Sequence, residues 1–336
     1  YEEHILRHRC LGSLKNPVPC VALCPAGVDI PGYISLVREG RYADAVRLIR
    51  KDNPFPTACA YICEHPCEAR CRRQMVDDAI NIRGLKRFAV DHAGKVPNPP
   101  KAKPTGKTVT VIGGGPGGLS AAYYLALMGH QVTIYEQRKQ LGGMLRYGIP
   151  SYRFPREKLD AEIDSILSLG IEVKTGVKVG QDVTFDQLRK EHDCLYISIG
   201  AHTDKRTGIP GEDSQGVISA VELLRQIGDG DLPDFHGKQV VVIGGGNVAI
   251  DVARTSVRCG AAEVSMYCLE PRESMPASAE EAAEAEDEGV AIRCGWGPKE
   301  ILAEAGRVTG IVLKRCVSVF DENGRFCPRY DEADTI

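Results

Sequence analysis

Three features are missing from this sequence, and each absence excludes a class of protein. No apolar run reaches the roughly 18 residues that a membrane helix needs, so we expect no membrane partner. Neither sign of charge dominates, since 42 Lys and Arg stand against 45 Asp and Glu, and nucleic acid is therefore not expected as a partner. None of the 13 cysteines forms a Cys-x-x-Cys pair, which argues against a redox-active disulfide of that kind.

Length and charge distribution suggest several domains. The 336 residues are enough for two or three, and the chain begins at Tyr1 without a methionine, which leaves room for an upstream segment. Residues 1–107 carry 18 Lys or Arg against 11 Asp or Glu, whereas the remainder carries 24 against 34. Two interpretations stay open: chance with solvated helix faces, or a basic end that offsets anionic clusters or docks a partner.

Cysteine is concentrated near the N-terminus. Dense cysteine beside nucleotide-binding signatures favours metal in a reducing compartment, here the cytoplasm, over disulfides. The candidate metal ligands are Cys10, Cys20, Cys24, Cys59, Cys63, Cys67 and Cys71. The other six are expected to be buried or indifferent thiols: Cys194, Cys259, Cys268, Cys294, Cys316 and Cys327.

A proline-rich segment divides the chain. Residues 1–95 are predicted to be helical and rich in loops, with helices over Ile34–Arg38 and Tyr42–Arg50. Residues 96–106 hold four prolines and predict a stiff, extended linker. Beyond it the pattern becomes α/β, with one dinucleotide-binding domain predicted over 107–205 and another over 206–336.

The first α/β segment carries a dinucleotide fingerprint. A strand over Thr108–Ile112 and a helix over Gly117–Met128 enclose Gly113-Gly-Gly115-Pro116-Gly117-Gly118, followed by a strand over Gln131–Tyr135. The glycines allow a tight turn, close approach of a pyrophosphate and packing of helix on strand. Glu136, at the end of the second strand, is placed to accept both ribose hydroxyls. The alternative is a plain glycine-rich turn.

The same unit returns 131 residues later, from Gly113 to Gly244. Gly244, Gly246 and Ala249 give G-x-G-x-x-A between strands over Gln239–Ile243 and Glu263–Leu269, with a helix over Val248–Arg258. Glu270 ends the second strand, and a carboxylate there favours NAD over NADP because it repels a 2′-phosphate. Alternatively, Glu270 faces solvent and Arg254 or Arg272 serves a phosphate. The acidic stretch Glu280–Glu288 is expected to be a solvated helix.

Two dinucleotide modules in one chain imply a relay between a fixed flavin and an exchangeable nicotinamide. In the N-terminal part, Cys20-x3-Cys24-Pro25 followed by cysteines at every fourth position from Cys59 to Cys71 is a ferredoxin-like ligand pattern for a [4Fe-4S] cluster. Pro66 makes a single helix through the second set unfavourable. Zinc and bare structural thiols are the alternatives.

The order of these parts, together with Leu141-Gly-Gly-Met-Leu-Arg-Tyr-Gly-Ile-Pro150, resembles the glutamate synthase small (β) subunit family. That family includes the N-terminal half of dihydropyrimidine dehydrogenase and the large subunit of NADH-dependent ferredoxin:NADP oxidoreductase. The resemblance covers essentially the whole chain. It implies an α/β fold with two Rossmann-like dinucleotide-binding domains, preceded by an all-helical iron–sulfur domain with two [4Fe-4S] clusters.

The resemblance also implies site residues. FAD would be contacted by Gly113, Gly115, Gly118, Glu136, Gly142, Gly143, Met144, Leu145, Gly200 and Ala201. The nicotinamide nucleotide would lie at Gly246, Asn247, Val248 and Asp251. No residue is assigned as an acid or base, because the protein's task in such a step is to position and tune the cofactors.

Departures from the family concern the clusters first. The second cysteine of the family's opening Arg-Cys-x2-Cys is Ser13 here, so one set holds only Cys10, Cys20 and Cys71. The other would hold Cys24, Cys63 and Cys67, where relatives add Gln or Glu at the position of Lys86. Cys59 is the expected substitute. Seven cysteines are available for the eight ligand positions of two clusters. The number of clusters therefore stays open between one and two, with two favoured.

Two further departures concern the nucleotides. NADPH-using relatives carry Tyr-Arg-Arg where this chain has Tyr267-Cys268-Leu269, which supports NAD. The ending Glu332–Ile336 resembles the approach to a strand that, in relatives, returns to cover the flavin. The resemblance thus predicts an electron-transfer flavoprotein that passes electrons between NAD(H) and a larger redox partner subunit. The alternatives are the glutamate synthase small subunit itself and a non-catalytic scaffold with a degenerate cofactor site.

Overall fold

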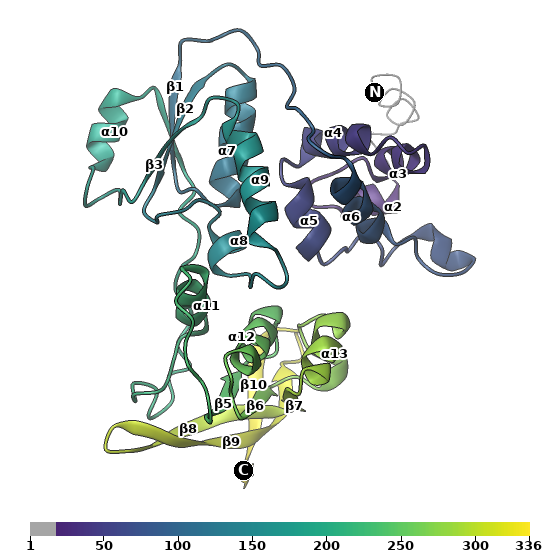
Figure 1. Ribbon diagram of the computed structural model, residues 1–336. Helices are drawn as coiled ribbons and strands as arrows, with labels where there is room; N and C mark the ends of the chain where they lie inside the picture. Colours follow the sequence, from purple (N-terminus) through teal and green to yellow (C-terminus); the bar gives the residue numbers. More distant parts are fainter. Residues whose placement is uncertain (1–17) are drawn as a thin grey trace. The chain divides into compact units, whose positions relative to one another are not determined.

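The computed structural model describes residues 18–336, so the predicted roles of Cys10 and Ser13 lie outside the described residues (Figure 1). Of these residues, 18–146 and 151–200 form one compact unit, and 147–150 with 201–336 form a second. Within the described part, no helix is long and apolar enough to span a membrane.

The N-terminal region of the first unit is helical, as predicted, and residues 18–95 contain no strand. Its elements are α2 (Pro19–Leu23), α3 (Ile30–Arg38), α4 (Tyr42–Asp52), α5 (Pro56–Ile62), the 3-10 turn η2 (Arg72–Met75) and α6 (Ile82–His92). Helix α3 begins where Asp29 accepts a hydrogen bond from the Gly32 N–H, and α6 begins where Asn81 does the same for Gly84. Tyr33, from α3, is fully buried in the core of this region.

The proline-rich segment is held against the next domain. The Asn98 side chain donates to Ser168 Oγ at 3.1 Å, and Lys101 Nζ donates to the Leu169 carbonyl at 2.8 Å. The backbone N–H of Ala102 donates to Leu127 O at 2.8 Å. These contacts tie the extended segment to two helices, so it is a docked connection and not a free spacer.

The rest of the first unit is a parallel sheet with helices on both faces, and Figure 1 shows α7 and α9 on one face and α10 on the other. Its elements are β1 (Thr108–Ile112), α7 (Pro116–Leu127), β2 (Gln131–Glu136), α8 (Met144–Tyr147), α9 (Arg156–Leu167), β3 (Glu172–Thr175), α10 (Phe185–Glu191) and β4 (Cys194–Ile197). The strand order is β3-β2-β1-β4. All four strands run parallel, so the turn after β1 lies at the carboxyl edge of the sheet, where β1 has β2 on one side and β4 on the other.

The second unit contains a smaller parallel sheet and an antiparallel sheet. Its elements are α11 (Ala220–Gly228), β5 (Gln239–Ile243), α12 (Asn247–Arg258), β6 (Glu263–Cys268), η3 (Arg272–Ser274), α13 (Ala279–Asp287), β7 (Ala291–Cys294), β8 (Trp296–Glu304), β9 (Arg307–Phe320) and β10 (Phe326–Thr335). The parallel order is β5-β6-β7, and the antiparallel order is β10-β9-β8. Ile250 and Met266, both fully buried, join α12 to the parallel sheet.

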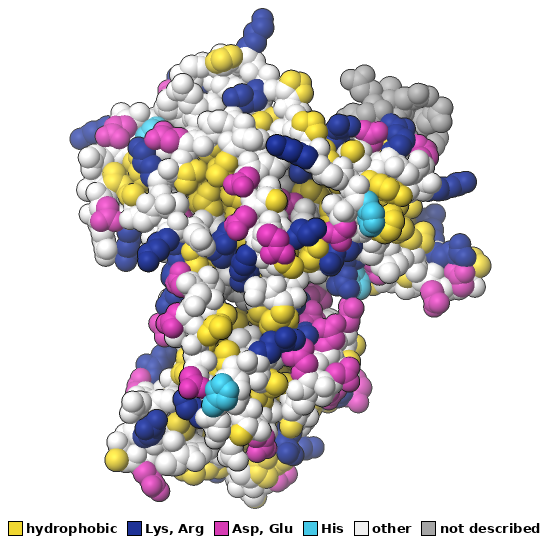
Figure 2. Space-filling view, in the orientation of Figure 1, with side chains coloured by type: hydrophobic (Ala, Val, Ile, Leu, Met, Phe, Trp, Pro, Cys, Tyr) yellow, Lys and Arg dark blue, Asp and Glu magenta, His cyan; other side chains and the backbone are white. Residues whose placement is uncertain are grey.

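The acidic stretch is a helix, as predicted, but it is more than a solvated one. Figure 2 shows Asp and Glu side chains gathered over the region of α13. The buried Arg254 of α12 forms ion pairs with three glutamates. Glu281 and Glu284 belong to α13, and Glu288 directly follows it. Since a buried guanidinium requires partners, this acidic face is part of the packing between the two helices.

Candidate functional site

The first glycine turn joins β1 to α7, and its first and third glycines are required by packing. Gly113 has φ of +108°, and a Cβ there would lie 2.2 Å from the Ser198 carbonyl oxygen. A Cβ on Gly118 would lie 1.9 Å from the Gly113 oxygen. Neither position admits a side chain without backbone movement, because real Cβ atoms essentially never approach so closely.

The second glycine of this turn, unlike the other two, has room for a Cβ. A Cβ on Gly115 would meet only the Gly143 Cα, at 3.6 Å, which is an ordinary contact. Gly115 precedes α7 at the N-cap, and no side chain caps that helix. The first-turn N–H groups are therefore available to an anion, with the positive end of the helix dipole behind them. Pro116 and Gly117 form the first turn of the helix.

Glu136 closes this turn from β2. Its carboxylate is buried and accepts hydrogen bonds from Gly114 N at 2.7 Å and from Arg138 N at 2.8 Å. Each carboxylate oxygen has a second lone pair, so Glu136 can shape the turn and still accept ribose hydroxyls.

The segment Gly142–Leu145 packs against the same turn. Gly142 N donates to Gly114 O at 2.8 Å, and a Cβ on Gly143 would lie 2.6 Å from the Gly115 Cα. Met144 and Leu145 begin α8, with Leu145 buried. The structure therefore brings residues 113–118, Glu136 and 142–145 together. Gly200 and Ala201 are exposed beyond β4, with Gly200 in the first unit and Ala201 in the second.

The second glycine turn joins β5 to α12, and its third position is Ala249 where the first turn has Gly118. Gly244 has φ of +137°, and a Cβ there would lie 3.5 Å from the Ala249 Cβ, so alanine fits. A Cβ on Gly246 would meet nothing within 4 Å, and no side chain caps α12. This helix start is thus also open to an anion. In its first turns, Val248 is exposed and Asp251 is buried.

Asn247 holds the neighbouring loop. Its Oδ1 accepts a hydrogen bond from Ser278 N at 3.0 Å, and Ala277 N donates to Gly245 O at 2.8 Å. The loop before α13 is therefore fastened to the glycine turn by two bonds. Nothing in the local sequence pattern indicated these partners.

Glu270 is half-buried and lies at the glycine loop. Its Oε2 is 3.2 Å from the position that a Gly245 Cβ would occupy. The two arginines that could serve a phosphate instead are paired with acids. Arg254 lies 2.7 Å from Glu284 and 2.6 Å from Glu288, and Arg272 lies 2.6 Å from Glu286. The Glu270 carboxylate thus lies at this loop, while both arginines already have carboxylate partners.

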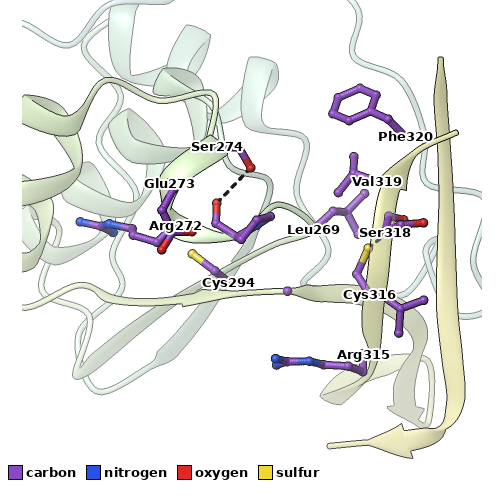
Figure 3. A pocket seen from close by; sticks show the side chains of 13 residues that line it. Leu269, Arg272, Glu273, Ser274, Cys294, Arg315, Cys316, Ser318, Val319 and Phe320 are labelled. Atoms are coloured by element: carbon purple, nitrogen blue, oxygen red, sulfur yellow. Dashed lines mark hydrogen bonds between the residues drawn. The ribbon is translucent and has the colours of Figure 1, made fainter. Parts of the chain in front are cut away.

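A cavity of about 500 Å³ lies beyond the carboxyl ends of β6 and β7 (Figure 3). Its lining includes Leu269 and Arg272 after β6, Cys294 at the end of β7, and Arg315 and Phe320 on β9. Ligands of parallel α/β sheets bind in this position. The contribution of β9 was not predicted, because only the glycine-linked strands carry a local signature.

The described cysteines of the helical region fall into two groups. Burial raises the pKa of Cys20, and the nearby Cys71 raises it further. Burial also raises the pKa of Cys67 to about 11, with Lys86 opposing and Cys63 and Cys24 adding to the shift. Cys71 is thus close enough to act on the pKa of Cys20, and Cys63 and Cys24 are close enough to act on that of Cys67.

Cys59 lies with the second group. Burial raises the pKa of its thiol, while a hydrogen bond from Asn53 and the charge of Lys86 lower it. The Asn53 amide donates to Cys59 Sγ at 3.0 Å, and His65 N donates to Cys63 Sγ at 3.4 Å. Across residues 18–336, no three His, Cys, Asp or Glu side chains are gathered closely enough to hold a single metal ion.

Some residues at these sites carry no sequence signal. Ser198 has its carbonyl against Gly113 and its Oγ 2.7 Å from the position of a Gly117 Cβ. It follows a short strand and belongs to no motif. Only its place in the sheet, next to β1, brings it to the turn.

Comparison with known proteins agrees with this geometry. Residues 4–97 match the family described as dihydropyrimidine dehydrogenase domain II, 4Fe-4S cluster. Residues 107–325, well over half of the chain, match the pyridine nucleotide-disulphide oxidoreductase family. The chain belongs to the pyridine nucleotide-disulphide oxidoreductases. Within them it is of the glutamate synthase small-chain type, as the resemblance predicted. It is therefore a redox enzyme subunit with an iron–sulfur domain and an FAD- and NAD(P)-binding region.

Individual relatives support the assignment. The chain is 41% identical to the NADP(+)-dependent formate dehydrogenase subunit beta of Moorella thermoacetica, over 92% of this chain and 48% of that subunit. It is 39% identical to the NADPH-Fe(3+) oxidoreductase subunit beta of Geobacter sulfurreducens, over 94% and 48%. It is 33% identical to the glutamate synthase [NADPH] small chain of Escherichia coli, over 91% and 68%. The chain thus spans about half the length of the first two relatives.

Solved structures show the same fold. FprA of Mycobacterium tuberculosis in complex with NADPH has a TM-score of 0.60 at 20% identity, over 70% of this chain and 68% of that one. The expected α/β architecture with Rossmann-like sheets is confirmed.

Proposed function

We propose that this chain is an electron-input subunit that takes hydride from NADH onto FAD and releases electrons through [4Fe-4S] clusters to a larger redox partner. One observation carries the proposal: in both turns the second glycine stands at an uncapped helix start with room for a Cβ. Packing alone does not require glycine at either position. A pyrophosphate bound by backbone N–H groups does.

The first turn fits FAD. The N–H groups of α7 would bind the pyrophosphate, Glu136 would accept the ribose hydroxyls, and Gly142–Leu145 would flank the flavin end. Bound FAD supplies the exchange between two-electron and one-electron chemistry. The protein's residues orient it and exclude water, and none needs to transfer a proton.

The second turn fits NAD. The names of the relatives given above point to NADP, so the preference of this chain is a specific claim about Glu270. A carboxylate held at the glycine loop accepts hydrogen bonds from an adenosine ribose and repels a 2′-phosphate. Cys268 and Leu269 stand where an arginine pair would grip that phosphate, and Arg254 is enclosed by glutamates.

The helical region would hold the iron. We propose Cys10, Cys20 and Cys71 for one cluster, and Cys24, Cys63, Cys67 and Cys59 for the other. Buried thiols such as Cys67 stay protonated without metal, because burial raises their pKa. Iron would deprotonate them on binding and draw the sulfurs together, since metal binding is coupled to folding.

The test of nucleotide preference compares NADH with NADPH as reductants of the flavin in the anaerobic, reconstituted full chain. We expect kcat/KM for NADH to exceed that for NADPH by at least about tenfold, equivalent to about 1.4 kcal/mol. Glu270→Arg should reduce this ratio about tenfold or more. The control Glu263→Arg makes the same charge change at the exposed opposite end of β6 and should leave the ratio unchanged. A wild-type preference for NADPH would refute the NAD assignment.

A second candidate is the small subunit of a glutamate synthase, because the chain covers 68% of the Escherichia coli small chain at 33% identity. Purification of the native complex distinguishes the two. A co-purifying large subunit with glutaminase activity would favour the second candidate.

A further inference from the structure

Two cysteines with no role in the proposed electron path lie side by side in the second unit. Cys268 ends β6 and Cys294 ends β7, and they are direct partners in the parallel ladder. Their sulfurs are 3.6 Å apart. Cys268 is 2% exposed, whereas Cys294 is half-buried and lines the cavity (Figure 3).

We propose that Cys268 and Cys294 are a redox-active dithiol, and that its oxidation by a small-molecule disulfide weakens nucleotide binding at the adjacent glycine loop. Both were expected to be buried or indifferent thiols, because they are scattered in or beside strand-like runs. They lie 26 residues apart, and no Cys-x-x-Cys marks them. Only the register of β6 and β7 brings them together.

The backbone geometry suits a disulfide. Adjacent strands lie about 4.8 Å apart, and disulfides join Cα atoms separated by about 4.4–6.8 Å. A disulfide needs its sulfurs about 2.05 Å apart, so these two must approach by roughly 1.5 Å. Rotation of the side chains and a small shift of the strand ends can supply that distance.

The environment assigns an order to the two thiols. Cys294 faces the cavity, so a small disulfide R–S–S–R can reach it, and Arg315 in the lining attracts an anionic one such as glutathione disulfide. Burial, together with the hydrogen bond to Cys294, raises the pKa of Cys268 to about 12, so Cys268 stays a thiol until Cys294 has reacted. Cys294 therefore reacts first.

The reaction balances without any other oxidant. The Cys294 thiolate attacks R–S–S–R, forming a Cys294–S–S–R mixed disulfide and releasing one RS⁻. Cys268 then loses its proton and attacks Cys294 Sγ, which forms the Cys268–Cys294 bond and expels a second RS⁻. Two thiols are oxidised and one small disulfide is reduced to two thiols.

Oxidation would reach the glycine loop through Cys268. The Cys268 Cβ lies 2.8 Å from the position that a Gly245 Cβ would occupy. Its single S–H is shared between Cys294 Sγ at 3.6 Å and the carbonyl oxygen of Glu270 at 3.5 Å. A disulfide removes that S–H donor and pulls the Cys268 sulfur toward β7. Cys268 stands two residues before Glu270, the residue proposed to bind the ribose. This consequence rests on the proposed nucleotide site, whereas the dithiol chemistry does not.

Cys316 lines the same cavity but is not the expected partner, since its sulfur donates to Ser318 O at 3.5 Å, along β9 (Figure 3).

The experiment treats the reduced full chain anaerobically with glutathione disulfide, blocks free thiols, and maps disulfide-linked peptides by mass spectrometry. NADH affinity is measured before and after oxidation and again after added dithiothreitol. We expect a peptide that links Cys268 to Cys294, and a dissociation constant that rises at least threefold on oxidation and recovers on reduction. Absence of the linked peptide, or a mixed disulfide at Cys294 that is never resolved, would overturn the dithiol.

Variants separate the pair from other cysteines. In Cys294→Ser and Cys268→Ser the reduced and treated proteins should bind NADH equally, and either variant suffices if the other fails to fold. Cys259→Ser, which removes a half-buried thiol of the same unit, should keep the full redox response. If oxidation weakened NADH binding in Cys294→Ser as much as in the wild type, the proposal would be contradicted. If the reduced protein bound no nucleotide, the proposed function would fail, and the linked peptide alone would decide the dithiol.

Discussion

Gly115 and Gly118 stand three residues apart in one turn, yet they require glycine for different reasons. Gly118 packs its Cα against the Gly113 carbonyl, where no Cβ fits. Gly115 has φ of −80° and ψ of −177°, which any residue adopts, and a Cβ there would make only an ordinary contact with the Gly143 Cα. The structure therefore separates a glycine needed for folding from a glycine needed for a ligand.

Alanine substitutions test this difference. Gly118→Ala should lower the free energy of unfolding by about 1–3 kcal/mol, because the helix must move away from the strand. Gly115→Ala should leave the stability within about 1 kcal/mol and raise the FAD dissociation constant about tenfold or more, because its methyl group enters the pyrophosphate space. Denaturant unfolding of the flavin-free protein and FAD titration measure the two effects. Equal FAD affinity in Gly115→Ala and the wild type would contradict the assignment.

Cys59 presents a second question at the scale of one residue. It lies beside Lys86 and Cys63, where the chain lacks the Gln or Glu expected from the family. Cys59→Ser should reduce the iron of the reconstituted chain from about eight to about four atoms, because one four-iron cluster loses a ligand. Cys194→Ser removes an exposed thiol and should leave iron unchanged. Unchanged iron in Cys59→Ser would show that another group completes the set.

Between elements, the main new contact is made by Glu162. This residue of α9 is 3% exposed and accepts hydrogen bonds from Thr57 N at 2.6 Å and Ala58 N at 2.9 Å, at the start of α5. A side chain of the sheet domain thus caps the helix that carries Cys59 and leads to Cys63. Burial raises the Glu162 pKa to about 7, and the two backbone donors oppose that shift.

The stability of the protein should therefore depend on pH through Glu162. Its folded pKa lies above its unfolded value of about 4.5, so the folded state binds the proton more tightly. This contribution to stability is present below the unfolded value and is lost as pH rises through about 7, by up to about 3 kcal/mol. Urea unfolding at a series of pH values measures the slope. Stability that rises across this range would contradict the assignment.

Glu162→Gln should remove that slope, because an amide does not titrate, and should destabilise the protein by about 1–3 kcal/mol, because its NH2 group would face a backbone N–H. Asp164→Asn removes one charge from the exposed face of the same helix and should change neither quantity appreciably. A pH slope that persists in Glu162→Gln would assign the titration to another group.

What the sequence predicted at this scale was local. The strand–glycine–helix–strand units were placed within about two residues, because turn, helix and strand signals lie in one stretch of chain. The Arg254 cluster, the Glu162 cap and the Cys268–Cys294 pair were not predicted. Each joins residues more than 20 positions apart, and such pairing leaves no periodicity in the sequence.

At the scale of the whole molecule, the two nucleotide-type turns belong to separate compact units, and the chain spans about half the length of its first relatives. The net positive charge of residues 1–107 lies in the part that would carry the clusters, where an acidic partner would be attracted. Electron transfer to such a partner requires that NADH reduce the flavin and that the flavin then reduce the clusters of the same chain.

The most direct measurement is an anaerobic titration of the reconstituted full chain with NADH, followed by flavin absorbance and by electron paramagnetic resonance. The account predicts that NADH bleaches the flavin and that the signal of a reduced [4Fe-4S] cluster then appears. Bleaching without any cluster signal, even after excess reductant, would contradict an exit through the helical region. A chain that retains no flavin would contradict the relay altogether and leave the scaffold as the better description.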